Sequence, residues 1–365
     1  GTFTSPYLLN YNEQIAINGL PISGEDFYSL LQSYQELLKK QADDTILQEI
    51  TEFEIITALA YDYFCQQEVD VVIMEVGLGG LLDSTNVCQP DLTAITTIGL
   101  DHTAILGATL ADIAEQKAGI IKERVPVVTG KISSEALTVI HTIAQQCQAL
   151  HIRYKKDYQV ESVQGLEEGE DFLFSNAFRQ KEDYQTVLLG IHQVENAGLA
   201  IELCDQYCYL KGLPLLSENE VRRALKRTYW PARLEKISNA PLILLDGAHN
   251  PHAMKALIAS LESYFPDYQK HILFSCIQTK ALDEMVALLK TVSKSQLFLT
   301  TFEDSRSFSK AEMQGLAKRE KLKYVEWLPY LEQYKKSKHG EKELLLITGS
   351  LYFLAEVRKN LMSDR

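Results

Sequence analysis

The chain has 365 residues, of which 46% are hydrophobic and 23% are charged. This length suits two domains, and the composition is that of an ordinary globular protein, which excludes a disordered or fibrous chain. The 36 Lys and Arg against 49 Asp and Glu give a net charge of -13, which repels nucleic acid phosphates and anionic membrane surfaces. We therefore expect no nucleic acid partner and no membrane partner.

The amino-terminal segment and the cysteines favour a cytoplasmic location. Residues 1–10 lack the regions of a signal peptide, and no segment approaches the roughly 20 consecutive apolar residues of a membrane span. The six cysteines form no CxxC pair and no Cys/His cluster at zinc spacing, so we expect reduced thiols in the core. Cys204 and Cys208 lie one helical turn apart, where core packing is favoured over metal ligation.

Short apolar runs alternate with helical stretches along the chain, which predicts an α/β fold with parallel sheets flanked by helices. Between two groups of runs, an amphipathic helix ending near Lys226 gives way to Pro231. This predicts two domains, residues 1–230 and 231–365, with a boundary near Trp230. The acidic segment 157–183 is expected to form a meander or an exposed hairpin. The expected strands are 69–74, 92–98, 125–128, 186–189, 242–245, 272–276, 296–300 and 343–347.

The first apolar run is followed by Glu75 and then by three glycines within residues 77–80. A carboxylate is thus delivered where a buried strand gives way to a glycine turn, which is where ligands bind in an open α/β sheet. Asp101 and His102 follow the next run and share this sheet edge if the two strands are neighbours. One carboxylate and one imidazole suit Mg²⁺, because water and substrate phosphates commonly fill its other positions. A structural role for His102 remains the alternative.

A lysine lies on the apolar face of the helix that is predicted to begin at Thr109, where Asp112 completes a capping box. This residue is Lys117. Burying an unpaired ammonium costs several kcal/mol, so the lysine must be paired, deprotonated or chemically altered, unless its stem only snorkels to solvent. Glu75, His102 and Lys117 would then converge. The apolar face consists of Leu110, Ile113, Ala114, Ala118 and Ile121.

The segment from Asp246 to Pro251 puts an acid, a histidine and a helix start at the end of the first strand of the second domain. Asp246 and His249 are placed to contact a bound group. Alternatively, Asp246 caps a turn and Asn250 caps a helix that Pro251 opens. Both interpretations can hold, because caps and ligand contacts share helix N-termini.

The ordered motifs of the whole chain resemble the folylpolyglutamate synthase and dihydrofolate synthase branch of the Mur ligase superfamily. In the first half they are Phe3-Thr-Ser-Pro-Tyr-Leu8, Asn12-Glu13, Ile15-x-Ile-Asn-Gly19, Thr51-x-Phe-Glu54, Glu75-Val-Gly-Leu-Gly-Gly80, Asp83-Ser-Thr-Asn86, Asp101-His102 and Glu115-Gln-Lys-Ala-Gly-Ile120. In the second half they are Gly190-Ile-His-Gln193, Asn196-Ala197, Arg233-Leu-Glu235, Asp246-Gly-Ala-His-Asn-Pro251 and Thr348-Gly-Ser-Leu-Tyr352.

This resemblance implies a two-domain Mur-ligase-like architecture, with a P-loop-type ATPase domain that carries the folate site and a Rossmann-like C-terminal domain. It implies a monomeric, ATP-dependent ligase that adds L-glutamate to the γ-carboxyl of tetrahydrofolate through an acyl phosphate. Dihydrofolate synthesis from dihydropteroate is a second activity of the family. By resemblance, Ser5, Glu75 and His102 are Mg²⁺ ligands and Lys117 is carbamylated by CO2. The modification would explain a lysine on an apolar face.

By the same resemblance, Asn196, Arg233, Asp246 and His249 hold the nucleotide, with Arg233 near the phosphates. His249 joins Glu75, His102 and Lys117 as an expected catalytic residue. The protein would mainly position the reactants, while the metal and the cations spread the charge that develops in phosphoryl transfer.

Several features depart from the family pattern. The family's glycine-rich phosphate loop, with its strand and helix, is expected upstream of Ser5, so the chain looks N-terminally truncated and is predicted to be nearly inactive alone. Tyr7, Leu81 and Ala232 stand where the family usually has His, Arg and Gly. Two alternatives therefore stay open. One is a non-catalytic folate- or nucleotide-binding relative, and the other is a Mur-type ligase with another carboxylate substrate.

Overall fold

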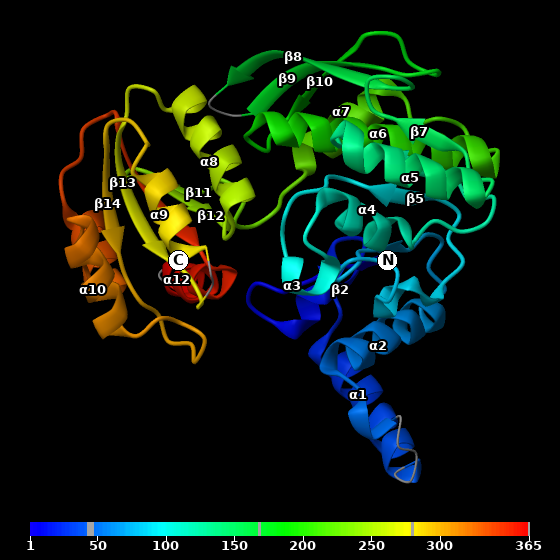
Figure 1. The fold of residues 1–365 in the computed structure, drawn as a ribbon, viewed down its shortest axis with the longest axis horizontal. Helices are drawn as coiled ribbons and strands as arrows, with labels where there is room; N and C mark the ends of the chain where they lie inside the picture. The colour runs from blue at the N-terminus through cyan, green and yellow to red at the C-terminus, as the bar shows by residue number, and fades with distance from the viewer. Residues whose placement is uncertain (42–46, 167–168, 279–280, 364–365) are drawn as a thin grey trace. The chain divides into compact units, whose positions relative to one another are not determined.

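The computed structural model describes residues 1–41, 47–166, 169–278 and 281–363, which fold into two compact units (Figure 1). The first unit comprises Gly1–Val127 and Ser133–His151, and the second comprises Val128–Ile132 and Ile152–Arg365. This division by contact falls elsewhere than the boundary near Trp230, which stays a prediction.

The first unit contains a four-stranded sheet of order β3-β2-β1-β4. Strand β1 pairs in parallel with β4 and antiparallel with β2. Two helices, α1 and α2, supply apolar side chains to the core over this sheet, where Phe3, Ile15 and Leu59 are fully buried. The elements are β1 (Thr2–Phe3), β2 (Ile15–Ile17), β3 (Leu20–Pro21), β4 (Ile73–Met74), α1 (Gly24–Lys40) and α2 (Glu52–Gln66), with 3-10 turns η1 (Tyr11–Gln14) and η2 (Leu47–Glu49).

The expectation of a buried strand over residues 69–74 is wrong. Only Ile73–Met74 is strand, and the side chains of Val71, Val72 and Ile73 are 42%, 38% and 64% exposed. Strand β4 is an edge strand whose only partner among the strands of the described ranges is β1. Within the part of the chain that the structure describes, the apolar run therefore has no strand on its other side, and an edge strand with exposed apolar residues is unusual in a folded protein.

The rest of the first unit carries the predicted lysine helix. Helix α4 (Leu110–Ala118) begins with the capping box of Thr109 and Asp112, as predicted. Its apolar face is buried at Ile113, Ala114 and Ala118. The remaining elements are η3 (Ser84–Val87), α3 (Thr103–Leu106), α5 (Ser134–Gln146) and β5 (Thr93–Ile95). Strand β5 belongs to a small sheet of order β5-β6-β7, and the chain passes between the two units within β6 (Val127–Thr129) and β7 (His151–Arg153).

The second unit begins with an antiparallel meander of order β10-β9-β8. The meander, one of the two forms predicted for residues 157–183, is confirmed, and its Phe172, Phe174 and Tyr184 are buried. The strand expected at 186–189 is misplaced, since β10 ends at Thr186. Alternate residues of these strands face the core, which is the period of a half-buried strand. The elements are β8 (Gln159–Leu166), β9 (Gly169–Ser175), β10 (Glu182–Thr186), α6 (Ile191–Lys211) and α7 (Glu218–Arg227).

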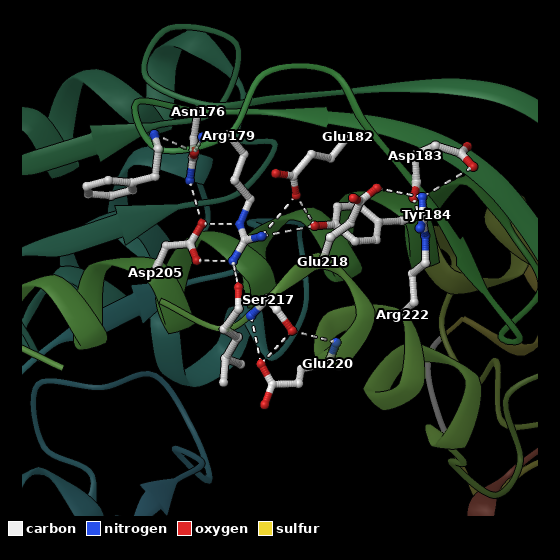
Figure 2. A network of polar contacts seen from close by, with 12 residues as sticks. Asn176, Arg179, Glu182, Asp183, Tyr184, Asp205, Ser217, Glu218, Glu220 and Arg222 are labelled. Carbon is white, nitrogen blue, oxygen red and sulfur yellow. Dashed lines mark hydrogen bonds and ion pairs between the residues drawn. The ribbon is translucent and has the colours of Figure 1, made fainter. Parts of the chain in front are cut away.

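A buried polar network centred on Arg179 joins this meander to its helices (Figure 2). The Arg179 guanidinium donates to both carboxylate oxygens of Asp205 at 2.7 Å and to the carbonyl of Leu216 at 2.7 Å. It also donates to Glu182 at 2.9 Å and to the hydroxyl of Tyr184 at 3.1 Å. The side chains of Arg179 and Asp205 are 4% and 1% exposed. Bidentate pairing satisfies both buried charges.

The C-terminal part of the second unit is a six-stranded sheet of order β11-β12-β16-β13-β14-β15. All its pairings are parallel except that of β11 with β12. The four strands predicted after residue 240 are confirmed within a few residues, and residues Leu344 to Ile347 are fully buried. The strands are β11 (Glu235–Asn239), β12 (Leu242–Asp246), β13 (Gln269–Ser275), β14 (Ser295–Leu299), β15 (Lys323–Tyr324) and β16 (Glu343–Gly349). The helices are α8 (Pro251–Tyr264), α9 (Leu282–Leu289), α10 (Lys310–Glu320), α11 (Trp327–Lys336) and α12 (Leu351–Ser363).

All six cysteines are free thiols, and Cys208 and Cys276 are buried as predicted. Cys65 and Cys204 are exposed, so core packing is wrong for these two positions. They lie on outer faces of α2 and α6. None of the helices that the structure describes combines the length and apolar character needed to cross a membrane.

Candidate functional site

Glu75 and Ser5 meet at the end of β4. The main-chain N–H of Ser5 donates to Oε2 of Glu75 at 2.8 Å, and the N–H of Glu75 donates to the carbonyl of Phe3 at 2.9 Å. The parallel pairing of β1 and β4 produces this contact, because both strands end at the same sheet edge. Glu75 is exposed there. The site therefore presents a carboxylate beside the Ser5 backbone at a strand end.

The glycine turn after Glu75 packs tightly against the end of helix α4. Gly79 has a φ of +72°, and a Cβ on Gly80 would lie 2.8 Å from the carbonyl oxygen of Gln116. Asp83 closes the turn by accepting the N–H of Leu78 at 2.8 Å. Glycine is thus required at Gly79 by conformation and at Gly80 by close approach.

Lys117 lies in the last turn of α4, directly beside this glycine turn. Its ammonium has no hydrogen bond or ion pair within the described part of the chain. Burial lowers the pKa of Lys117, and the charges of Asp101 and Asp83 act in the opposite direction. A lowered pKa increases the fraction of neutral amine, which is the form that can react with CO2.

His102 follows Asp101 and adopts a left-handed conformation with a φ of +48° at the start of α3. Its N–H donates to Oδ1 of Asp101 at 2.8 Å, and its side chain is 56% exposed. Non-glycine residues in this conformation are uncommon and cluster at functional sites. Asp101 thus connects the two candidates, because its carboxylate contacts His102 and acts on the charge of Lys117.

The first-unit residues fit a Mg²⁺ ion of the kind that uses few protein ligands. Across residues 1–41, 47–166, 169–278 and 281–363, no group of three or more His, Cys, Asp and Glu side chains could hold a metal by itself. Mg²⁺ typically binds one or two protein oxygens and fills its octahedron with water and phosphate oxygens. An exposed Glu75 carboxylate at a strand end suits that role. The combination of Ser5, Glu75 and His102 as ligands stays a prediction.

In the second unit, Asp246 is buried, with 9% of its surface exposed. Its Oδ2 accepts the N–H of Leu234 and its Oδ1 accepts the N–H of Ala248, both at 2.9 Å. Burial raises the pKa of Asp246, while these hydrogen bonds and the nearby Arg233 and His249 oppose that rise. Both carboxylate oxygens thus organise the turn that carries the other candidate residues.

His249 is exposed and its ring orientation is fixed. Nδ1 lies 2.9 Å from the carbonyl oxygen of Gly247, which can only accept, so Nδ1 carries a proton. Nε2 is then the nitrogen left for a ligand. Asn250 caps α8 by accepting the N–H of Ala253 at 2.8 Å, with Pro251 opening the helix. The capping interpretation is confirmed for Asn250.

Arg233 lies between two non-glycine residues in the left-handed conformation, Ala232 with a φ of +58° and Leu234 with a φ of +45°. Its Nη1 is 3.5 Å from the position that a Cβ on Gly247 would occupy, so its guanidinium lies against the turn that Asp246 holds. Arg233, Asp246 and His249 are therefore brought together, as the sequence predicts for residues on neighbouring turns.

Asn196 is exposed on α6, where its amide donates to Oε1 of Gln193 at 3.2 Å. His192, one turn earlier, was quoted as part of a motif but given no role. Burial, and then the charge of Arg233, lower the pKa of His192. Its Nδ1 is buried and has no hydrogen-bond partner among the described residues. The motif Gly190-Ile-His-Gln193 was the only available signal for this residue, because its neighbour Arg233 lies far away in sequence.

Comparison with known proteins places both parts of this geometry in one family. Residues 31–204 match the Mur ligase middle domain, and residues 232–351 match the glutamate ligase domain of Mur ligases. The dihydrofolate synthase/folylpolyglutamate synthase of Bacillus subtilis is 37% identical over 362 residues. That match covers 99% of this chain and 84% of the relative.

Solved structures give the same result. The folylpolyglutamate synthase of Thermotoga maritima superposes with a TM-score of 0.85 at 31% identity, over 100% of this chain and 82% of the other. A folylpolyglutamate synthase complex with the ATP analogue AMPPCP and folate superposes with a TM-score of 0.81 at 32% identity, over 99% of this chain and 83% of the other. The two-domain Mur-ligase-like fold is thereby confirmed. This chain belongs to the folylpolyglutamate synthase/dihydrofolate synthase family of the Mur ligase superfamily.

Proposed function

We propose that this chain is an ATP-dependent ligase that joins L-glutamate to the γ-carboxyl of tetrahydrofolate or its glutamates. The observation that carries the proposal is the match over 99% of the chain to a dihydrofolate synthase/folylpolyglutamate synthase, together with the family's complex with AMPPCP and folate. The reaction activates the folate carboxylate as an acyl phosphate, and the amine of glutamate then displaces phosphate. Dihydropteroate is proposed as a second substrate on the same grounds.

In the first unit, Ser5, Glu75 and His102 would hold Mg²⁺, which would neutralise charge on the phosphates when bound. The exposed Glu75 carboxylate supports its part of this role. Lys117 is proposed to carry a carbamate, because its lowered pKa favours the neutral amine. The modified side chain would be an anion, and a nearby metal would offset its repulsion by Asp101.

In the second unit, Asn196, Arg233, Asp246 and His249 are proposed to form the nucleotide site. Arg233 would supply positive charge to the phosphates, and the oriented Nε2 of His249 would accept a hydrogen bond. Asp246 would act through the turn it holds, because both its oxygens already accept main-chain N–H groups.

The two family matches lie on either side of residue 230, which supports the proposed domains 1–230 and 231–365. A cytoplasmic location and a monomeric state remain predictions of the sequence and of the family resemblance.

The test is release of ADP from Mg-ATP in the presence of tetrahydrofolate and L-glutamate, with each omitted in turn. It should be run on this chain and on a version extended ahead of Gly1 with a glycine-rich phosphate-loop segment. ADP release that needs both substrates, in either version, supports the ligase. Folate binding without turnover in both versions would instead favour the non-catalytic relative. Turnover only when another carboxylate substrate replaces tetrahydrofolate would favour a different Mur-type ligase.

The proposed carbamate has a separate test. Incubation with ¹³C-labelled bicarbonate should give a carbamate carbon signal in the NMR spectrum of the chain, and Lys117→Arg should remove it. Arginine retains the positive charge, so loss of the signal reports the amine itself. Lys122→Arg, a change at the next lysine along the chain, serves as the matched control and should leave the signal in place.

A further inference from the structure

The loop that presents Arg233 is strained. Ala232 and Leu234, on either side of Arg233, have φ values of +58° and +45°. A residue with a Cβ is strained in this conformation. Such a conformation persists only where the surrounding structure imposes it. The position of Arg233 therefore depends on whatever holds the residues beside it.

Three main-chain groups of this loop are held by hydrogen bonds. The N–H of Ala232 donates to Oε2 of Glu235 at 2.9 Å, and the N–H of Leu234 donates to Oδ2 of Asp246 at 2.9 Å. The N–H of Gly247 donates to the carbonyl of Ala232 at 2.8 Å. Glu235 thus holds one side of the loop, and the Asp246 turn holds the other.

Glu235 is itself fixed by Arg358, which is 123 residues later in the sequence, and by the nearby Tyr229. Nε of Arg358, on the last helix α12, lies 3.1 and 3.3 Å from the two carboxylate oxygens of Glu235. Nη2 of Arg358 donates to the hydroxyl of Tyr229 at 2.7 Å, and that hydroxyl donates to Oε1 of Glu235. We call Tyr229, Glu235 and Arg358 the Glu235 cluster. The side chains of Glu235 and Arg358 are 5% and 10% exposed, so each charge requires the other.

Neither Glu235 nor Arg358 is among the residues placed at the nucleotide site. The loop that they hold, however, orients Arg233, which is one of those residues. The guanidinium of Arg233 lies against Gly247, and its charge lowers the pKa of His192. A change in the backbone of residues 232–234 would move this guanidinium relative to both neighbours.

We propose that Glu235 and Arg358 are positioning residues for the ligase reaction, which hold the strained loop so that Arg233 is directed at the nucleotide phosphates. The inference rests on the proposed function, which assigns Arg233 to the nucleotide phosphates. Small displacements of a binding group are costly, since misplacement by about 1 Å can reduce a rate by about 100-fold.

The first experiment measures the position of Arg233 without a ligand. The pH titration of His192 is followed by NMR in the wild type, Arg358→Met and Arg233→Met. Removing the Arg233 charge should raise the pKa of His192, and Arg358→Met should raise it in the same direction because Arg233 moves away. An unchanged titration in Arg358→Met would overturn the proposal.

The second experiment measures binding of a non-hydrolysable ATP analogue by calorimetry, at a temperature where circular dichroism shows every variant folded. Arg358→Met should weaken binding by about tenfold. Arg179→Met is the matched control, because it breaks an equally buried arginine–carboxylate pair in the same unit and leaves the Arg233 loop intact. It should change binding by less than about twofold. Equal losses in the two variants would reduce the Glu235 cluster to a general stabilising role and overturn the proposal.

A double-mutant cycle isolates the route through Arg233. In the Arg233→Ala background, Arg358→Met should add almost nothing to the loss of affinity, because the group it positions is gone. Full additivity would overturn the proposal. If the wild type binds no nucleotide but the His192 titration responds as expected, the positioning of Arg233 stands and the proposed function fails.

Two milder variants cover the case in which Arg358→Met does not fold. Tyr229→Phe keeps the ion pair and removes only the hydroxyl that joins its two members, so it should shift the His192 titration less but in the same direction. Arg358→Lys keeps the charge and loses the second donor, so it should recover part of the wild-type affinity. No shift in Tyr229→Phe together with no recovery in Arg358→Lys would overturn the proposal.

Discussion

Two strand ends with the same local sequence pattern have opposite environments. In each, an apolar run leads to an acid and a glycine turn, with Glu75 directly after β4 and Asp246 as the last residue of β12. β4 has one partner strand, and its Ile73 is 64% exposed, whereas β12 has two, and its Leu244 is fully buried. The exposed acid is left at the surface, and the buried one is used to hold main-chain N–H groups. Within the described ranges, the acid that follows a strand with one partner is exposed, and the acid that ends a strand with two partners is buried.

The largest expected difference is between shortening an apolar side chain in β16 and shortening one in β4. Leu346→Ala in β16 should lower the free energy of unfolding by about 3 kcal/mol, because the side chain is fully buried. Ile73→Ala in β4 should cost less than about 0.5 kcal/mol, as for an exposed position. Both tryptophans, Trp230 and Trp327, lie in the second unit, so their fluorescence reports Leu346→Ala in urea and circular dichroism reports Ile73→Ala. Similar losses would mean that β4 is covered in solution.

The next largest expected difference is in stability, between variants of Asp246 and variants of Glu75. Asp246→Ala removes the acceptor for two buried N–H groups and should cost about 2 kcal/mol of stability. Glu75→Ala should leave stability within about 0.5 kcal/mol, and it should abolish Mg²⁺-dependent turnover in the version extended ahead of Gly1. Asp246→Asn keeps one acceptor oxygen and should recover part of the loss in urea unfolding. A stability loss from Glu75→Ala as large as that from Asp246→Ala would remove the distinction.

Stability should depend on pH through His339, which contacts Glu343 at the start of β16 in the six-stranded sheet. Both ring nitrogens of His339 face acceptors, the Tyr334 carbonyl at 2.6 Å and Glu343 at 3.0 Å, an arrangement that favours the imidazolium form. Burial lowers the pKa of His339, but these two acceptors outweigh burial and raise it above 6.5. His271 and Tyr330 also face this cluster.

A histidine with a raised pKa in the folded state stabilises most below its unfolded pKa, and this stability is lost as the pH rises through the folded value. Unfolding in urea should therefore show a loss of stability above pH 6.5 that His339→Phe abolishes. His252→Phe, at an exposed histidine in the same unit, should leave the pH dependence unchanged. A wild-type profile that is flat over this window would contradict the assignment of an imidazolium.

The smallest expected effect is at the strained loop beside the buried acid. Ala232→Gly should raise stability by about 0.5 kcal/mol, because relief of the left-handed strain exceeds the added freedom of the unfolded chain. Gly212→Ala is the reverse control, since Gly212 has a φ of +64° with open space around it, and it should cost about 1 kcal/mol. Destabilisation by Ala232→Gly would show that the loop is not strained.

The sequence predicted the elements whose burial is set locally. The strands around Leu244 and Leu346 could be predicted because residues buried on both faces form continuous apolar runs. The capping box at Thr109 predicted the start of α4 for a similar local reason. The local apolar run around Ile73 predicts a buried strand, but its burial depends on which strand lies beside β4, and that is a property of the assembled sheet.

The candidate site shows the same limit. Asp246 and His249 could be found because a single motif carries both. The partnership of Glu235 with Arg358 joins residues 123 positions apart, and no local pattern indicates it. The left-handed conformations of Ala232 and Leu234 were equally hidden, since neither residue is the glycine that usually marks such a backbone.

The Arg179 network has a consequence for how the second unit opens. One guanidinium holds the C-terminal half of α6 through Asp205, the strand β10 through Glu182 and Tyr184, and the segment before α7 through Leu216. Detaching any one of these segments leaves a buried charge without its partner, so partial opening is unfavourable. The meander, α6 and α7 are therefore expected to behave as a single foldon, with amide protons that exchange at one common opening free energy.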